Sequence, residues 1–168
     1  VAALQAGDTH YTSISGRLPL RERIARQHSR SSGQPVDAGN VVVVGGAQNG
    51  MFVASLCLCE AGDEVLVPEP LYLTYEATIR ASGATLVPLP VHPDDGFRID
   101  IQALREAITP RTRAIFFATP CNPTGVAMRR HELQAIADLA IAHDLWVVAD
   151  EVYGALTFEA EHISIAGL

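Results

Sequence analysis

Four segments of this 168-residue chain carry residues that could bind a small charged or polar ligand, and each lies at the end of a short apolar run. Together they offer the backbone N–H groups of a glycine-rich turn, a side-chain amide, a carboxylate and two tyrosine rings. The segments are GGAQNG at 45–50, PEPLY at 68–72, TPCNPTG at 119–125 and DEVY at 150–153.

The glycine-rich turn at 45–50 could bind a phosphate. It leads into an apolar segment of helical length, so the backbone amides of Ala47 and Gln48 would point at the anion and the helix dipole would favour its charge. The alternative is a plain tight turn, because G-G-x-x-x-G matches neither the P-loop nor the dinucleotide-binding fingerprint.

Asn122, Asp150 and Tyr153 lie just after two of the other apolar runs. The sequence around Asn122 is first of all a turn signal, and its functional interpretation is a side-chain amide fixed by the rigid Pro123. A carboxylate at position 150 is costly beside a buried strand unless a cation or an N–H group pairs with it, and the alternative is an N-cap for the next segment. For Tyr153 the alternative is a half-buried ring without a function.

The twelve cationic side chains of the chain are all arginines, so the sequence contains no lysine. Chemistry that requires a side-chain primary amine is therefore excluded within these 168 residues. This rules out a Schiff-base lysine, a P-loop lysine and a lysine general base in this chain.

Apolar β-branched runs alternate with helix-like segments along most of the chain, which is typical of βαβ units. The predicted strands are 41–44, 64–68, 84–89, 114–119 and 145–149, and the predicted helices are 20–31, 49–60, 71–82, 100–108 and 130–143. The sequence therefore predicts an α/β fold with a mostly parallel, doubly wound sheet and flanking helices. Ligands of such sheets bind beyond the carboxyl ends of the strands. Residues 1–40 are predicted to form an N-terminal arm and helix, and residues 41–168 the domain itself.

The composition excludes several classes of protein. With 48% hydrophobic and 18% charged residues the chain can bury a core, and its net charge of −7 argues against nucleic acid as a partner. Three cysteines provide neither a disulfide framework nor a zinc site, which indicates reduced thiols in a cytoplasmic protein and no metal. No apolar run reaches the ~20 residues of a membrane span, so no membrane partner is expected.

Five stretches, taken in order, resemble class I/II aminotransferases, which are pyridoxal-phosphate enzymes of fold type I. The resemblance covers nearly the whole chain, and N-P-T-G followed by A-D-E-V-Y is its most specific part. It implies the central part of a large cofactor-binding domain, incomplete in this chain. The stretches are HYTSISGRLPLRERIA at 10–25, VVVVGGAQNGMF at 41–52, GDEVLVPEPLYLTYEA at 62–77, ITPRTRAIFFATPCNPTG at 108–125 and HDLWVVADEVYGALTF at 143–158.

The resemblance implies a role for four side chains around the ring of pyridoxal 5′-phosphate. Asp150 would face the pyridine nitrogen and keep it protonated, so that the ring can accept electrons from the substrate α-carbon. Asn122 and Tyr153 would hydrogen-bond the 3-oxygen of the ring, and Tyr72 would stack on its face.

The resemblance also implies contacts at the phosphate. The amides of Ala47 and Gln48 would hold the 5′-phosphate, and Tyr11 resembles a tyrosine that reaches the phosphate of the neighbouring subunit's cofactor. The expected assembly is therefore a homodimer with shared active sites.

The implied function is transfer of an amino group between an amino acid and a 2-oxo acid. The segments GDTHY at 7–11 and EHISIAGL at 161–168 most resemble a subgroup that includes aromatic, aspartate and arginine–pyruvate transaminases. The family's Schiff-base lysine follows a later strand, so the chain is expected to be a fragment that contains no catalytic residue and is inactive alone. The alternatives are a pyridoxal-phosphate-dependent carbon–sulfur lyase or another β-eliminating relative, and a non-catalytic cofactor-binding or interaction domain.

Overall fold

The computed structural model describes residues 1–158 and 161–168. The chain forms two compact units, Val1–Val44 and Gly45–Leu168. Among the described residues, none of the helices combines the length and the apolar character that are needed to span a bilayer.

The Val1–Val44 unit is built around one long helix. Its elements are α1 (Ala2–Gln5), α2 (Leu18–Ser32) and the 3-10 helix η1 (Ala38–Asn40). Helix α2 carries proline in its first turn and ends at Gly33, whose φ of 78° suits a residue without a Cβ atom. The helix predicted at 20–31 is therefore confirmed, with α2 extending slightly beyond both predicted ends.

The strand predicted at 41–44 is wrong. Val42 is 63% exposed, and the N–H group of Val43 donates to the carbonyl of Ser15 over 2.9 Å instead of to a neighbouring strand. A run of valines favours extended backbone, but it forms a strand only where another strand accepts its backbone hydrogen bonds.

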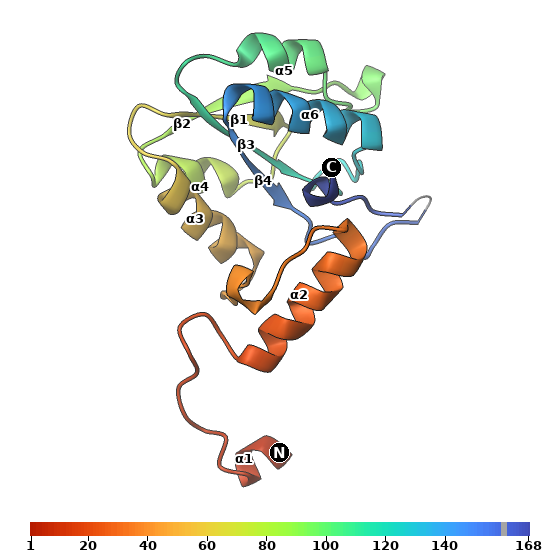
Figure 1. The fold of residues 1–168 in the computed structure, drawn as a ribbon. Helices are drawn as coiled ribbons and strands as arrows, with labels where there is room; N and C mark the ends of the chain where they lie inside the picture. The colour runs from red at the N-terminus through yellow and green to blue at the C-terminus, as the bar shows by residue number, and fades with distance from the viewer. Residues whose placement is uncertain (159–160) are drawn as a thin grey trace. The chain divides into compact units, whose positions relative to one another are not determined.

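The Gly45–Leu168 unit contains a four-stranded parallel sheet with the strand order β2-β1-β3-β4 (Figure 1). These strands confirm the other four predicted ones to within two residues at each end. They are β1 (Glu64–Glu69), β2 (Thr85–Pro90), β3 (Thr112–Ala118) and β4 (Trp146–Asp150).

Helices cover both faces of this sheet, because alternate side chains of each strand point to opposite sides. Val65, Val67 and Phe116 pack in one apolar cluster with side chains of α3 (Ala47–Leu58) and α4 (Tyr75–Arg80). Leu66, Ile115 and Phe117 pack in a second cluster with side chains of α5 (Ile101–Ala107) and α6 (Arg130–His143). Figure 1 shows α3 and α4 on one side of the strands and α5 and α6 on the other. The predicted doubly wound α/β fold is confirmed.

Two short 3-10 helices, η2 (Pro93–Asp95) and η3 (Ile165–Gly167), complete the unit. Because all four strands are parallel, their carboxyl ends lie at one edge of the sheet. The chain that leaves β1, β3 and β4 at this edge carries three of the four polar segments noted above, those at 68–72, 119–125 and 150–153.

Candidate active site

The carboxyl edge of the sheet holds a cavity of about 190 Å³. The last residues of β3 and β4, the first turn of α3 and the start of α4 all contribute to its wall. Its lining residues are Ala47, Gln48, Tyr72, Tyr75, Ala118, Asn122, Asp150, Val152 and Tyr153. Six of the seven residues predicted for the cofactor thus lie around one cavity, although the sequence separates them by up to about a hundred positions.

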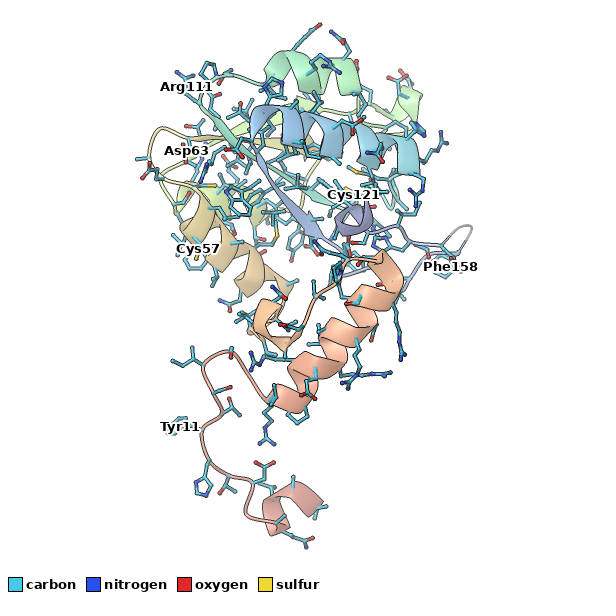
Figure 2. All side chains as sticks on the ribbon, in the orientation of Figure 1. Tyr11, Cys57, Asp63, Arg111, Cys121 and Phe158 are labelled. Atoms are coloured by element: carbon cyan, nitrogen blue, oxygen red, sulfur yellow. The ribbon has the colours of Figure 1, made fainter. Side chains whose placement is uncertain are left out.

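Tyr11 is the seventh predicted residue and belongs to the Val1–Val44 unit. Its side chain is fully exposed on the extended segment between α1 and α2 (Figure 2). Its contact with a neighbouring subunit stays a prediction.

Asp150 ends β4, where it is paired with Ala118 of β3. Its carboxylate is half-buried and accepts two hydrogen bonds: Oδ2 from the hydroxyl of Tyr75 at 2.8 Å and Oδ1 from the backbone N–H of Val152 at 3.0 Å. The bond from Val152 is of the local capping type that was the alternative interpretation of this residue. The bond from Tyr75 is not local, and it meets the need of a half-buried carboxylate for a donor.

Tyr75 is the first residue of α4 and is only 2% exposed. Burial, followed by the hydrogen bond to Asp150 and the charge of that carboxylate, raises the pKa of the Tyr75 hydroxyl far above its ordinary value of 10.0. Near neutral pH its hydroxyl is therefore protonated and donates to Asp150. The rings of Tyr72 and Tyr75 meet edge to face with centroids 6.3 Å apart.

The turn before α3 has the backbone shape that exposes the first N–H groups of a helix. Gly46 is the N-cap residue with a φ of 102°, and no side chain caps the helix there. The side chain of Gln48 is occupied elsewhere: its Oε1 accepts from the hydroxyl of Thr74, and its Nε2 donates to Oγ1 of Thr78 over 2.5 Å. What α3 offers the cavity at its N-terminus is thus backbone N–H groups and the positive end of the helix dipole.

Asn122 lies on the loop that joins β3 to α6, and this loop is firmly held. Thr119 Oγ1 accepts from the N–H of Met128 at 2.9 Å, and Nη1 of Arg98 donates to the carbonyl of Ala127 at 2.8 Å. The same Nη1 lies 3.1 Å from Oε2 of the buried Glu132. Asn122 therefore lies on a loop that two partly buried hydrogen bonds fix to the domain.

Tyr72 and Tyr153 line the cavity while remaining 42% and 38% exposed. Each ring thus has a face or an edge that a ligand could cover. Within residues 1–158 and 161–168, no three His, Cys, Asp or Glu side chains gather as a metal-binding group.

Sequence reasoning assigned no role to Thr74, Tyr75 or Thr78, although the first two lie in the stretch quoted at 62–77. The repeated spacing of Tyr72 and Tyr75, three positions apart at a predicted helix start, is the signal that could have drawn attention to Tyr75. No comparable signal marks the two threonines, because their partner Gln48 lies 26 and 30 positions away.

Comparison with known proteins decides the family. The family model described as "Aminotransferase class I and II" matches residues 2–168. The chain belongs to the class I and II aminotransferases. This confirms the resemblance seen in the motifs, and enzymes of this family depend in general on pyridoxal phosphate.

Among its relatives, arginine–pyruvate transaminase of Pseudomonas aeruginosa is 48% identical over the whole chain. The structure of Thermus thermophilus aspartate aminotransferase with maleate matches 99% of the chain, with a TM-score of 0.94 and 37% identity. N-succinyldiaminopimelate aminotransferase from Mycobacterium tuberculosis matches the same share with a TM-score of 0.93 and 42% identity. The chain spans 43% of the length of the Pseudomonas relative and 44% of each of these two solved chains.

Proposed function

We propose that the cavity at the carboxyl edge of the sheet is the pyridoxal 5′-phosphate site of an amino-acid aminotransferase. The observation that carries the proposal is the composition of the cavity wall. It combines a carboxylate held by two donors, the uncapped N-terminus of a 12-residue helix, and two partly exposed tyrosine rings. These groups suit a ligand that has a protonated ring nitrogen, a phosphate and an aromatic face.

Asp150 is the residue proposed to hold the ring nitrogen. Each of its oxygens accepts one hydrogen bond within the protein, so each keeps acceptor capacity for the ligand. Its negative charge keeps the ring nitrogen protonated. When bound, pyridoxal phosphate supplies the electron sink for reaction at the substrate α-carbon.

The remaining contacts are divided between the ring and the phosphate. Asn122 and Tyr153 are proposed to hydrogen-bond the ring oxygen, and Tyr72 to stack on the ring. The backbone amides of Ala47 and Gln48 are proposed to bind the phosphate, supported by the shape of the turn at Gly46 and by the dipole of α3.

We also propose the place of this chain in the complete enzyme. Residues 41–168 form part of the large cofactor-binding domain and residues 1–40 an arm and helix that lead into it. Tyr11 contributes to the site of a partner subunit in a homodimer. The Schiff-base lysine comes from a segment outside these 168 residues, so the 168-residue chain alone does not catalyse transamination.

The identity of the relatives guides the choice of substrates to test. The relative that is 48% identical is named for arginine and pyruvate, and two solved relatives are named for aspartate and N-succinyldiaminopimelate. The proposed substrates are therefore an amino acid with a polar or charged side chain as donor and a 2-oxo acid as acceptor.

Steady-state assays of the full-length protein test this proposal. We expect amino transfer from at least one of these donors to a 2-oxo acid, and a loss of about 100-fold or more in kcat/KM for Asp150→Ala, because a charge-assisted bond to the ring nitrogen is lost. Asp138→Ala is the control, since this aspartate lies on α6, accepts from the side chain of Gln134 and does not line the cavity. Release of ammonia and a 2-oxo acid without an amino acceptor would instead indicate a lyase.

A further inference from the structure

The start of α4 contacts two side chains of the cavity wall, Gln48 earlier in the sequence and Asp150 later in it. Thr74 and Thr78 bind the side chain of Gln48, which follows the glycine-rich turn, and Tyr75 binds Asp150 at the end of β4. We infer that the Thr74–Thr78 turn is a positioning element, in which Tyr75 orients Asp150 and the two threonines fix the N-terminal turn of α3. This inference rests on the proposed function, because it deepens the roles of these two groups toward the ligand.

The contact with Asp150 is suited to orienting a carboxylate. Tyr75 is 2% exposed and its ring is packed with Val67, Ile79 and Phe116 in the cluster beneath α3 and α4. A ring packed in this way holds its hydroxyl in one place. Together with the N–H group of Val152 it donates to both oxygens of Asp150, and two donors on two oxygens determine the rotation of the carboxylate.

The contacts with Gln48 are suited to fixing a helix end. Both polar atoms of the Gln48 amide are used, one by each threonine, so the side chain ties the first turn of α3 to α4. Thr78 is 4% exposed, which places this tie against the core. The backbone N–H groups of the same turn then keep a constant direction toward the cavity.

We expect the tyrosine and the threonines of this turn to affect the binding of different parts of the ligand. Tyr75→Phe keeps the packed ring and removes the donor to Asp150. Thr78→Val keeps the shape of the side chain and removes the hydroxyl that binds Gln48. Tyr75→Phe should therefore weaken binding of the ligand's ring, and Thr78→Val should weaken binding of its phosphate.

Binding of two probes to the full-length protein separates these effects. Pyridoxal 5′-phosphate reports both ends of the site, and pyridoxal, which lacks the phosphate, reports the ring end alone. We expect Tyr75→Phe to weaken both probes by about tenfold, the size of one hydrogen bond to a charged group. We expect Thr78→Val to weaken pyridoxal 5′-phosphate by about fivefold and to leave pyridoxal binding unchanged.

A double-mutant cycle shows whether Tyr75 acts through Asp150. In the Asp150→Asn background, Tyr75→Phe should cause less than a twofold further loss of pyridoxal binding, because the group that it orients has lost its charge. Thr85→Val serves as the control variant, since this threonine is exposed on β2 and does not line the cavity.

Four outcomes would count against these proposals. Folded variants that bind both probes as the wild type does would overturn the inference, and so would equal weakening of both probes by Thr78→Val. A full further loss from Tyr75→Phe in the Asp150→Asn background would overturn the role of Tyr75. A wild-type protein that binds neither probe would refute the proposed function itself, and the inference with it.

Discussion

The ion pair between Arg98 and Glu132 is predicted to hold the loop that carries Asn122. Glu132 is 4% exposed and its Oε2 accepts from Arg98 Nη1 at 3.1 Å and from the backbone N–H of Arg129 at 2.6 Å. Breaking a buried pair costs about 3–5 kcal/mol. Because the Arg98 side chain is 29% exposed and water can reach it, we expect Glu132→Ala to lower the free energy of unfolding by about 3 kcal/mol.

Urea unfolding followed by the fluorescence of Trp146, the single tryptophan of these 168 residues, measures this change. The matched control is Glu76→Ala, which breaks an exposed pair with Arg80 of shorter distance, 2.7 Å. We expect this control to cost at most about 0.5 kcal/mol, because water solvates both partners when the pair is broken. If the two substitutions lowered the free energy of unfolding equally, burial would not determine how much an ion pair stabilises the protein, and the prediction would be refuted.

Three further predictions concern pH, backbone shape and packing. The hydroxyl of Thr109 and the guanidinium of Arg111 lower the pKa of Glu64, so its stabilising effect is complete above its ordinary pKa of 4.5 and is lost as the pH falls below it. Glu64→Gln should therefore flatten the acid side of the stability profile. Gly46→Ala should cost about 1–3 kcal/mol because its φ of 102° and ψ of 166° lie in a region that is essentially limited to glycine. Leu133→Ala should cost about 2–5 kcal/mol because Leu133 is fully buried on α6.

Unfolding measurements on each variant and a control test these three predictions. Unfolding between pH 3 and pH 7 checks Glu64→Gln, and a variant whose acid profile matches that of the wild type would contradict it. Gly45→Ala is the control for Gly46→Ala, because the added Cβ would meet only Asn49 at 4.0 Å; equal costs would exclude backbone strain as the cause. Ile141→Ala, at a residue of α6 that is 79% exposed, should cost less than about 0.5 kcal/mol, unlike Leu133→Ala.

Local patterns in the sequence predicted most of the secondary structure of the Gly45–Leu168 unit. The bounds predicted for α6, 130–143, agree with the structure because its apolar stripe is long and regular. The helix predicted at 71–82 is only Tyr75–Arg80, since residues 72–75 form a turn in which the N–H of Tyr75 donates to the carbonyl of Tyr72. The strand at 41–44 failed because pairing depends on distant segments that a local pattern does not describe.

The difference between local patterns and distant contacts also explains which residues of the site could be predicted. Asp150 and Asn122 follow strands, so the rule for parallel sheets was enough to bring them together. The turn before α3 was grouped with them because it follows the strand predicted at 41–44, which does not form. Tyr75 was missed because its partner lies 75 positions away and only the packing of α4 on the sheet brings the two side chains into contact. For Gln48 the sequence predicted only a backbone N–H group that binds phosphate. Its side-chain hydrogen bonds to two threonines could not be predicted from the spacing of these residues.

The proposed role of Asp150 in cofactor binding can be measured as the dissociation constant of pyridoxal 5′-phosphate for the full-length protein and for its Asp150→Ala variant. We expect one bound cofactor per chain and an affinity about 10–100-fold weaker in the folded variant, which corresponds to the loss of one charge-assisted hydrogen bond. Equal affinity of the two proteins would contradict the assignment of Asp150 to the ring nitrogen. A wild-type protein that does not bind the cofactor would refute the proposed cofactor site.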